Sequence, residues 1–294
     1  MAPKPNIIDA TLERHKVPIW IKPYIYKYVK NNPVEAVKRV TSFIEVKRKK
    51  GEVNGKYIKL PNGMTFKISV IIHILNLFYY EENILADIKR EWAVGFIDGN
   101  HPDYRSHFAS MSDLNAKRMS AVKNLIEGLN YKVGEPSKEV VDVFEYVRNI
   151  RDPCERIIAL NVILMDAYAK PFGYIFYKVF YRAAPEFMRS FGKAFRSTEP
   201  ENLWGIEESR RIIKQGLVDN DHLIALAEGI LSRTCRSVDA EMAIARDSKI
   251  ETEAKLLRDI SIAYPLHHLS DMGVRIDIET EINKIIKLSE SHVK

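Results

Sequence analysis

Residues 157–177 read Ile-Ile-Ala-Leu-Asn-Val-Ile-Leu-Met-Asp-Ala-Tyr-Ala-Lys-Pro-Phe-Gly-Tyr-Ile-Phe-Tyr, and this stretch decides the fold. It is apolar on every face except at Asn161, Asp166 and Lys170. A helix that is hydrophobic all round lies at the centre of a larger structure, because each of its faces needs an apolar neighbour. The sequence therefore predicts a central helix over about 152–183.

Helical segments flank this central helix on both sides. An apolar period of about 3.6 residues predicts them at 67–98, 104–129, 201–215, 219–233, 237–263 and 277–290. The connections are short enough for antiparallel neighbours. Before them, 57–60 and 64–66 flank Pro61-Asn62-Gly63 in the pattern of a single β-hairpin.

We therefore expect an all-α protein with two parts. Residues 1–66 form an N-terminal helical appendage with the small hairpin, and residues 67–294 form a helical bundle domain with extra C-terminal helices. Hydrophobic residues make up 46% of the chain and charged residues 29%, which excludes a wholly disordered or collagen-like protein. Only 13 glycines in 294 residues disfavour the loop-rich sandwich and barrel classes.

Charge, cysteine content and the N-terminal sequence indicate which partners and which cellular compartment to expect. The net charge of +6 favours weak attraction to polyanions. Cys154 and Cys235 lie far apart in helical segments, so we expect small buried or half-buried thiols in a reducing cytoplasm rather than a disulfide framework. The N-terminus has no apolar leader, and no stretch has the length and apolarity of a membrane span.

Charged residues inside the apolar helices are the candidate functional groups. Asp166 and Lys170 are four residues apart, and a buried carboxylate needs a partner, so we expect an ion pair between them or a metal at Asp166. Glu81 and Glu82 follow an apolar run, and helical spacing turns one of the two inward.

This arrangement resembles the ferritin-like family of di-iron carboxylate proteins. In that family four long helices supply a Glu from each of two and a Glu-x-x-His from each of the other two. Glu82 matches the Glu of the first helix, and the resemblance covers about residues 67–215. It implies a long-helix bundle, iron or manganese as cofactor with Glu82, Asp166 and Glu208 as ligands, and oxidoreductase-like chemistry.

The sequence departs from the family at both histidine positions. Asn115-x-x-Arg118 and Glu208-x-x-Arg211 stand where Glu-x-x-His is expected, and a protonated Arg cannot bind a metal. The departure suggests a core charge network in place of the metals. Its members would be Glu82, Arg118, Asp166, Lys170, Glu208 and Arg211.

Two functions follow, and the sequence leaves both open. One is a degenerate relative of di-iron oxygenases; the other is a metal-free nucleic-acid-binding or scaffold protein that uses its basic surface, alone or as a homo-oligomer. Arg189, Lys193 and Arg196 form one basic stripe at helical spacing, and Arg210, Arg211 and Lys214 form a second patch.

Remaining motifs carry less chemistry. Asp219-x-x-His222 opens a helix, where an Asp is more often a cap than a ligand. Residues 264–271 hold two adjacent histidines and an acid after a proline break, as a loop or helix-end cluster. Glycine-rich phosphate loops, Cys-x-x-Cys, Gly-x-Ser-x-Gly and His-Glu-x-x-His are absent from the sequence, which disfavours ATPases, Rossmann dehydrogenases, zinc ribbons and serine hydrolases.

Overall fold

The computed structural model describes residues 52–54, 57–59, 65–95, 101–128, 130–169, 199–244 and 251–291. Over these residues the protein is helical apart from three short strands, so the all-α prediction is confirmed. The expected helices before residue 51, Lys170 and the stripe of Arg189, Lys193 and Arg196 lie outside the described residues.

A small antiparallel sheet precedes the first long helix. Its strands β1 (Glu52–Asn54), β2 (Tyr57–Lys59) and β3 (Thr65–Lys67) pair in the order β1-β2-β3. In the β2–β3 pair, Ile58 lies opposite Phe66. The turn expected at 61–63 lies outside the described residues.

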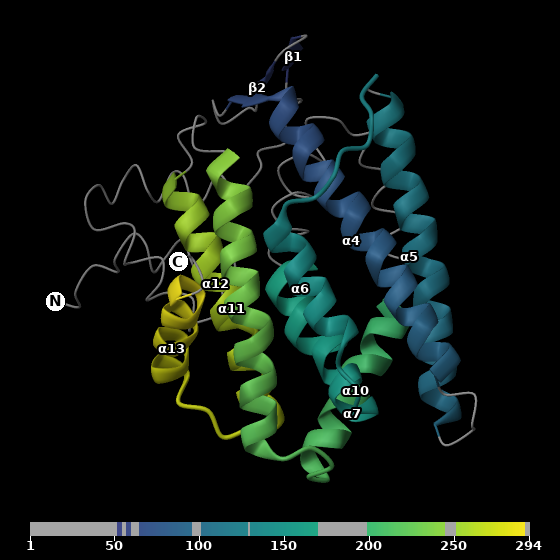
Figure 1. Ribbon diagram of the computed structural model, residues 1–294, viewed down its shortest axis with the longest axis vertical. Coiled ribbons are helices and arrows are strands. Elements are labelled where there is room, and N and C mark those ends of the chain that lie inside the picture. Colours follow the sequence, from purple (N-terminus) through teal and green to yellow (C-terminus); the bar gives the residue numbers. More distant parts are fainter. Residues whose placement is uncertain are drawn as a thin grey trace, which may run out of the picture.

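Two long helices follow, and they lie side by side over much of their length (Figure 1). They are α4 (Ile68–Gly95) and α5 (Pro102–Gly128), close to the predicted bounds. The two helices bury apolar side chains such as Ile88 and Phe108 between them and their neighbours. Four of the eight buried Asp, Glu, Lys and Arg residues in the described ranges lie on this pair: Glu81, Glu82, Lys89 and Arg118.

A short helix that the sequence reasoning missed comes next. Ser137 caps α6 (Lys138–Arg148) by accepting a hydrogen bond from the backbone of Val140. Val140, Val143, Phe144 and Val147 form its buried face. The i, i+3, i+4, i+7 spacing of these residues was a detectable signal.

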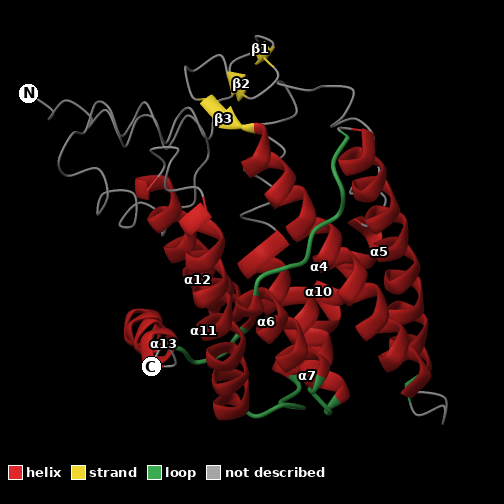
Figure 2. Cartoon of the chain, turned by 45° about the horizontal axis from the view of Figure 1, so that its top comes forward, coloured by secondary structure: helices red, strands yellow, loops and turns green. Residues whose placement is uncertain are grey.

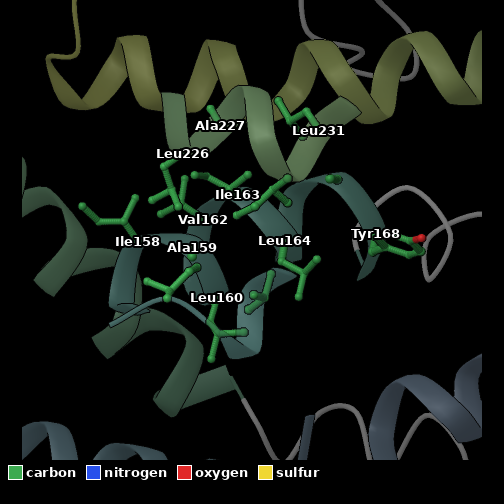
Figure 3. Close-up of a cluster of buried hydrophobic side chains, with 14 of the residues drawn as sticks. Ile158, Ala159, Leu160, Val162, Ile163, Leu164, Tyr168, Leu226, Ala227 and Leu231 are labelled. Carbon is green, nitrogen blue, oxygen red and sulfur yellow. The ribbon is translucent and has the colours of Figure 1, made fainter. Parts of the chain in front are cut away.

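The central helix is present, and its described part ends at residue 169. Asp152 caps α7 (Pro153–Ile158) by accepting hydrogen bonds from the backbone of the next turn. α7 continues into a π-helical segment, η2 (Ala159–Ala169). Figure 3 shows its side chains packed against Leu226, Ala227 and Leu231 of the neighbouring helix.

The remaining helices complete the bundle, with α11, α12 and α13 on the side away from α5 (Figures 1 and 2). The bounds are α10 (Glu199–Lys214), α11 (Asn220–Ile244), α12 (Glu251–Met272) and α13 (Ile278–Ser291). No helix in the described ranges is both long enough and apolar enough to cross a membrane.

Two predicted boundaries were wrong. α11 continues through 234–236, where a break was expected, because Cys235 is buried and the Thr234 hydroxyl bonds back to the Ile230 carbonyl. α12 continues through Pro265 to Met272 instead of ending at 263, so the segment 264–271 lies at the end of a helix, which is one of the two expected alternatives. Complete burial of Leu266 and Leu269 offsets the backbone hydrogen bond that the proline cannot donate.

Candidate functional site: a buried charge network

Three charged residues of α4 lie in the interior. Glu81 is 6% exposed, Glu82 4% and Lys89 4%. One inward-facing glutamate was expected, and both are buried. α4 has neighbours on more than one side: Glu82 accepts a hydrogen bond from Asn115 of α5, and Glu81 lies close enough to Tyr168 of η2 to contribute, after burial, to its raised pKa.

Glu82 is the shared acceptor of a hydrogen-bonded network between α4 and α5. Its Oε2 accepts from Asn115 Nδ2 at 2.6 Å and from Arg118 Nε at 2.8 Å. Asn115 Oδ1 in turn accepts from Lys89 Nζ at 2.8 Å. Glu82, Asn115, Arg118 and Lys89 are called the Glu82 network below. The network joins the two helices. Its donors Asn115 and Arg118 stand at positions where the sequence resemblance led us to look for metal ligands.

Burial changes the protonation of the groups around this network. Burial and the neighbouring charge of Glu82 raise the pKa of Glu81 to about 8. Burial and the guanidinium of Arg118 lower the pKa of Lys89 to about 7. Glu81 therefore holds its proton at neutral pH, and the ion pair of Glu82 with Arg118 carries charge in a region where unpaired ions are costly.

His107 forms a second polar contact, between α5 and α10. Its Nδ1 lies 3.1 Å from Oε2 of Glu201, whose Oε1 accepts from the Ser110 hydroxyl at 2.9 Å. The ring of Trp204 lies against the imidazole, with centroids 4.3 Å apart. Burial is the main reason why the pKa of His107 falls to about 4, so the imidazole is neutral near pH 7.

Asp166 is fully buried and its described partner is a histidine. Its Oδ2 lies 2.6 Å from Nδ1 of His268 on α12. The predicted partner Lys170 lies outside the described residues. His268 was expected in a loop or helix-end cluster, and it lies near the end of α12. The sequence signal that this segment reaches the core was the pair of apolar residues Leu266 and Leu269, which share one helix face.

Two further contacts between distant helices were not foreseen, one of them part-buried and the other buried. His73 of α4 contacts the buried carboxylate of Glu241, and the Tyr168 hydroxyl donates to Ser237. Burial raises the pKa of Tyr168. These contacts tie α4 and η2 to α11 through long-range pairs, which no spacing rule within one segment can predict.

Glu208 and Arg211 pair with each other at the surface end of the bundle. Glu208 Oε1 accepts from the Tyr104 hydroxyl at 2.7 Å, and Arg211 donates to both carboxylate oxygens at 2.6 and 2.8 Å. These bonds to Arg211 lower the pKa of Glu208. The side chain of Arg211 is 46% exposed, so its predicted place in the core was wrong: a guanidinium pairs with Glu208 one turn away while it stays hydrated.

The residues around Glu82 do not fit a metal. Its Oε2 already accepts from a guanidinium and an amide, and a cation bound there would lie beside Arg118 and near Lys89. Within the described part of the chain, no three His, Cys, Asp or Glu side chains are grouped to hold a metal ion.

Other predicted features have simple structural roles. Asp219 accepts a hydrogen bond from the His222 backbone, which confirms it as a helix cap. Cys154 is half-buried and Cys235 buried, both as free thiols. In the α10 patch, Arg210 pairs with Glu207 just as Arg211 pairs with Glu208, which reduces the charge this patch offers a polyanion.

Comparison of the chain with models of protein families, with curated proteins and with solved structures finds no match. The function is therefore argued from the contacts described above.

Proposed function

We propose that the protein is a metal-independent relative of the ferritin-like bundles, in which the Glu82 network takes the place of the metal ions. In this proposal the chain acts as a binding or scaffold protein, and its helical bundle supplies a rigid body rather than an oxygen-activating centre. The proposal includes ferritin-like connectivity of the long helices.

One observation carries the proposal: Asn115 and Arg118 donate to the same oxygen of Glu82. In the family that the sequence resembles, the corresponding positions hold the Glu and His that bind metal. Here they hold an amide and a guanidinium, which are hydrogen-bond donors to a carboxylate. The positive charge that a metal would supply is thus supplied by a side chain.

Burial of the pair supports a structural role. The side chains of Arg118 and Glu82 are 6% and 5% exposed, so their charges depend on each other for compensation. Loss of one partner of a buried pair costs about 3–5 kcal/mol, because an uncompensated charge stays behind. Because separating Glu82 from Arg118 would cost this much free energy, the pair holds α4 and α5 in one orientation relative to each other.

The test is the metal content of protein produced in medium supplemented with iron and manganese. We expect far less than one equivalent of either metal per chain after purification without chelator. About two metal ions per chain, as di-iron proteins hold, would overturn the proposal. Metal that is bound by the original chain and lost in Glu82→Ala or Glu208→Ala would overturn it as well.

A second measurement concerns the partner. Fluorescence anisotropy of labelled single-stranded RNA and DNA at low and high salt separates a polyanion-binding scaffold from one that binds other partners. Binding through Lys and Arg weakens steeply as salt rises, because phosphate contacts release counterions. Salt-dependent binding would assign nucleic acid as the partner class; no binding at low salt would leave a protein partner or self-association.

A further inference from the structure

The C-terminal helix α13 packs on α11 and α12 through one narrow face. Glu281, Ile282, Ile285 and Ser289 form that face. Three of the four recur at a four-residue spacing, so they lie along one stripe of the helix. Ile282 and Ile285 are apolar, and Glu281 is a carboxyl group buried among them with 8% exposure.

Glu281 faces a second acid across the interface. Glu281 and Glu228 of α11 both lie against the same ammonium group, that of Lys284 on α13. Lys284 contacts Glu228 and lies 3.9 Å from Oε1 of Glu281. That Oε1 is buried and receives no hydrogen bond from any described residue.

Two carboxylates beside one ammonium group leave one negative charge uncompensated, and a buried, uncompensated carboxylate is avoided when one of the two groups keeps its proton. Lys284 compensates one negative charge, and Asp277 before α13 adds another acid nearby. At the end of α12, His267 and Asp271 interact with each other. The charge balance around Glu281 therefore holds only while the acid pair keeps its proton.

We propose that α13 is a pH-responsive cover: Glu281 and Glu228 share one proton when the helix is docked, and loss of that proton loosens α13 from α11. Burial and the neighbouring carboxyl group of Glu228 raise the pKa of Glu281 to about 7, which places the change near neutral pH. The sign follows from linkage. A carboxyl whose pKa is raised by docking favours the docked form fully below its ordinary pKa of 4.5 and loses that advantage as pH rises through 7.

Cys235 supplies a native probe of this motion. It is 1% exposed on α11 and lies near Ser289 of α13, with Asp239, Arg258 and Asp259 around it. A maleimide reaches the thiol only when α13 moves away. The chain has two cysteines, so Cys154→Ser leaves Cys235 as the single thiol.

The experiment measures the rate of Cys235 labelling by N-ethylmaleimide from pH 5.5 to pH 8 in the Cys154→Ser chain. Each rate is divided by the rate of the same chain in denaturant at that pH, which removes the effect of thiol ionisation. We expect the corrected rate to rise roughly tenfold across this range. Glu281→Gln keeps a donor to Glu228 without a charge, and its corrected rate should stay flat.

Two further variants complete the design. Glu228→Gln removes the other acid and should also flatten the profile, so the test stands even if one variant does not fold. Glu279→Gln, an exposed acid in the same turn of α13, should keep the full rise. A flat profile in the Cys154→Ser chain, or an equal rise in Glu281→Gln and Glu228→Gln, would overturn the proposal. Metal content has no part in this readout.

Discussion

Glu82 is the side chain on which the contact between α4 and α5 depends. It accepts from two residues of α5, and one of these also connects to Lys89. A carboxylate with so many donors is stable inside a protein, whereas a buried carboxylate alone is not. Loss of a donor therefore leaves more than a missing hydrogen bond.

We expect Arg118→Met to lower the free energy of unfolding by about 3 kcal/mol, because it leaves Glu82 buried without its cation. Urea unfolding at pH 7 gives the value. Arg90→Met is the matched control, since Arg90 forms an exposed pair with Asp87 at 3.3 Å and should change stability by less than about 0.5 kcal/mol.

The double variant Glu82→Gln with Arg118→Met sharpens this prediction. Removal of both charges should recover at least half of the loss, because no buried ion is left over. If Arg118→Met costs no more than the Arg90 control, the Glu82 network does not hold the two helices as described.

His107 provides a pH dependence with a definite sign. Its pKa falls from 6.5 to about 4 on folding, so the folded state binds fewer protons than the unfolded state in that range. The stability that neutral His107 contributes is present above pH 6.5 and is lost as pH falls toward 4. The free energy of unfolding, measured with urea, falls between pH 7 and pH 4.5. We expect this fall to be about 2 kcal/mol smaller in His107→Gln than in the original chain.

His222→Gln is the control for that measurement. His222 is exposed at the start of α11, and its substitution should leave the pH profile of the original chain. An identical profile for His107→Gln would show that the imidazole is charged in the folded protein below pH 6.5, contrary to the structure.

The sequence predicted the position of a side chain where its spacing along a helix determined the helix face on which it lies. Glu82, Asn115 and Arg118 were singled out by helix position, and the structure joins them. Lys89 was missed because it stands in a charged stretch beside Arg90, which suggests a solvated helix end. Its distance of seven residues from Glu82, two helical turns, was the signal for a shared face.

At the scale of elements, α10 crosses η2 at unusually close range. A Cβ at Gly205 would overlap the Asn161 side chain, which bonds to the Ile157 carbonyl. A glycine here is required by space rather than by backbone conformation. The close crossing brings Glu201 and Trp204 to His107.

We expect Gly205→Ala to lower stability by about 1–3 kcal/mol, because the added methyl forces the two segments apart. Thermal or urea unfolding measures the effect. Gly128→Ala is the control, since nothing lies within 4 Å of an added Cβ at the end of α5. Asn161→Ala combined with Gly205→Ala should restore part of the loss; strict additivity of the two would contradict the overlap.

Element prediction from sequence was accurate for long helices and weak for breaks. α4, α5 and α10 begin and end within a few residues of their predicted bounds. α6 was overlooked because eleven residues between two long helices resemble a connection, although Ser137 and the valine spacing mark it. α11 continues past Cys235 because residues far along the chain, among them Arg258 and Ser289, pack around this side chain.

At the scale of the whole molecule, the proposed function predicts indifference to metals. The melting temperature should be the same with EDTA and with added iron(II) or manganese(II), because a ligand stabilises a fold only if it binds the folded state. Differential scanning fluorimetry provides the measurement. A rise with metal that EDTA reverses would contradict the proposal.

The all-α class was predictable because helical periodicity extends over most of the chain beyond residue 67. The pairing of distant helices was not. Asp166 with His268 and His73 with Glu241 are separated by 102 and 168 residues. No local pattern selects such partners, since each is one of several polar residues that a helix could turn inward.

The contact between Trp204 and His107 gives the protein an optical indicator of its own. An imidazolium quenches the emission of an adjacent indole, and these two rings lie 4.3 Å apart. With the other two tryptophans, Trp20 and Trp92, changed to Phe, all indole emission would come from this contact. A fluorescence titration toward acid pH would then report, without any added label, the pH at which His107 becomes protonated between α5 and α10.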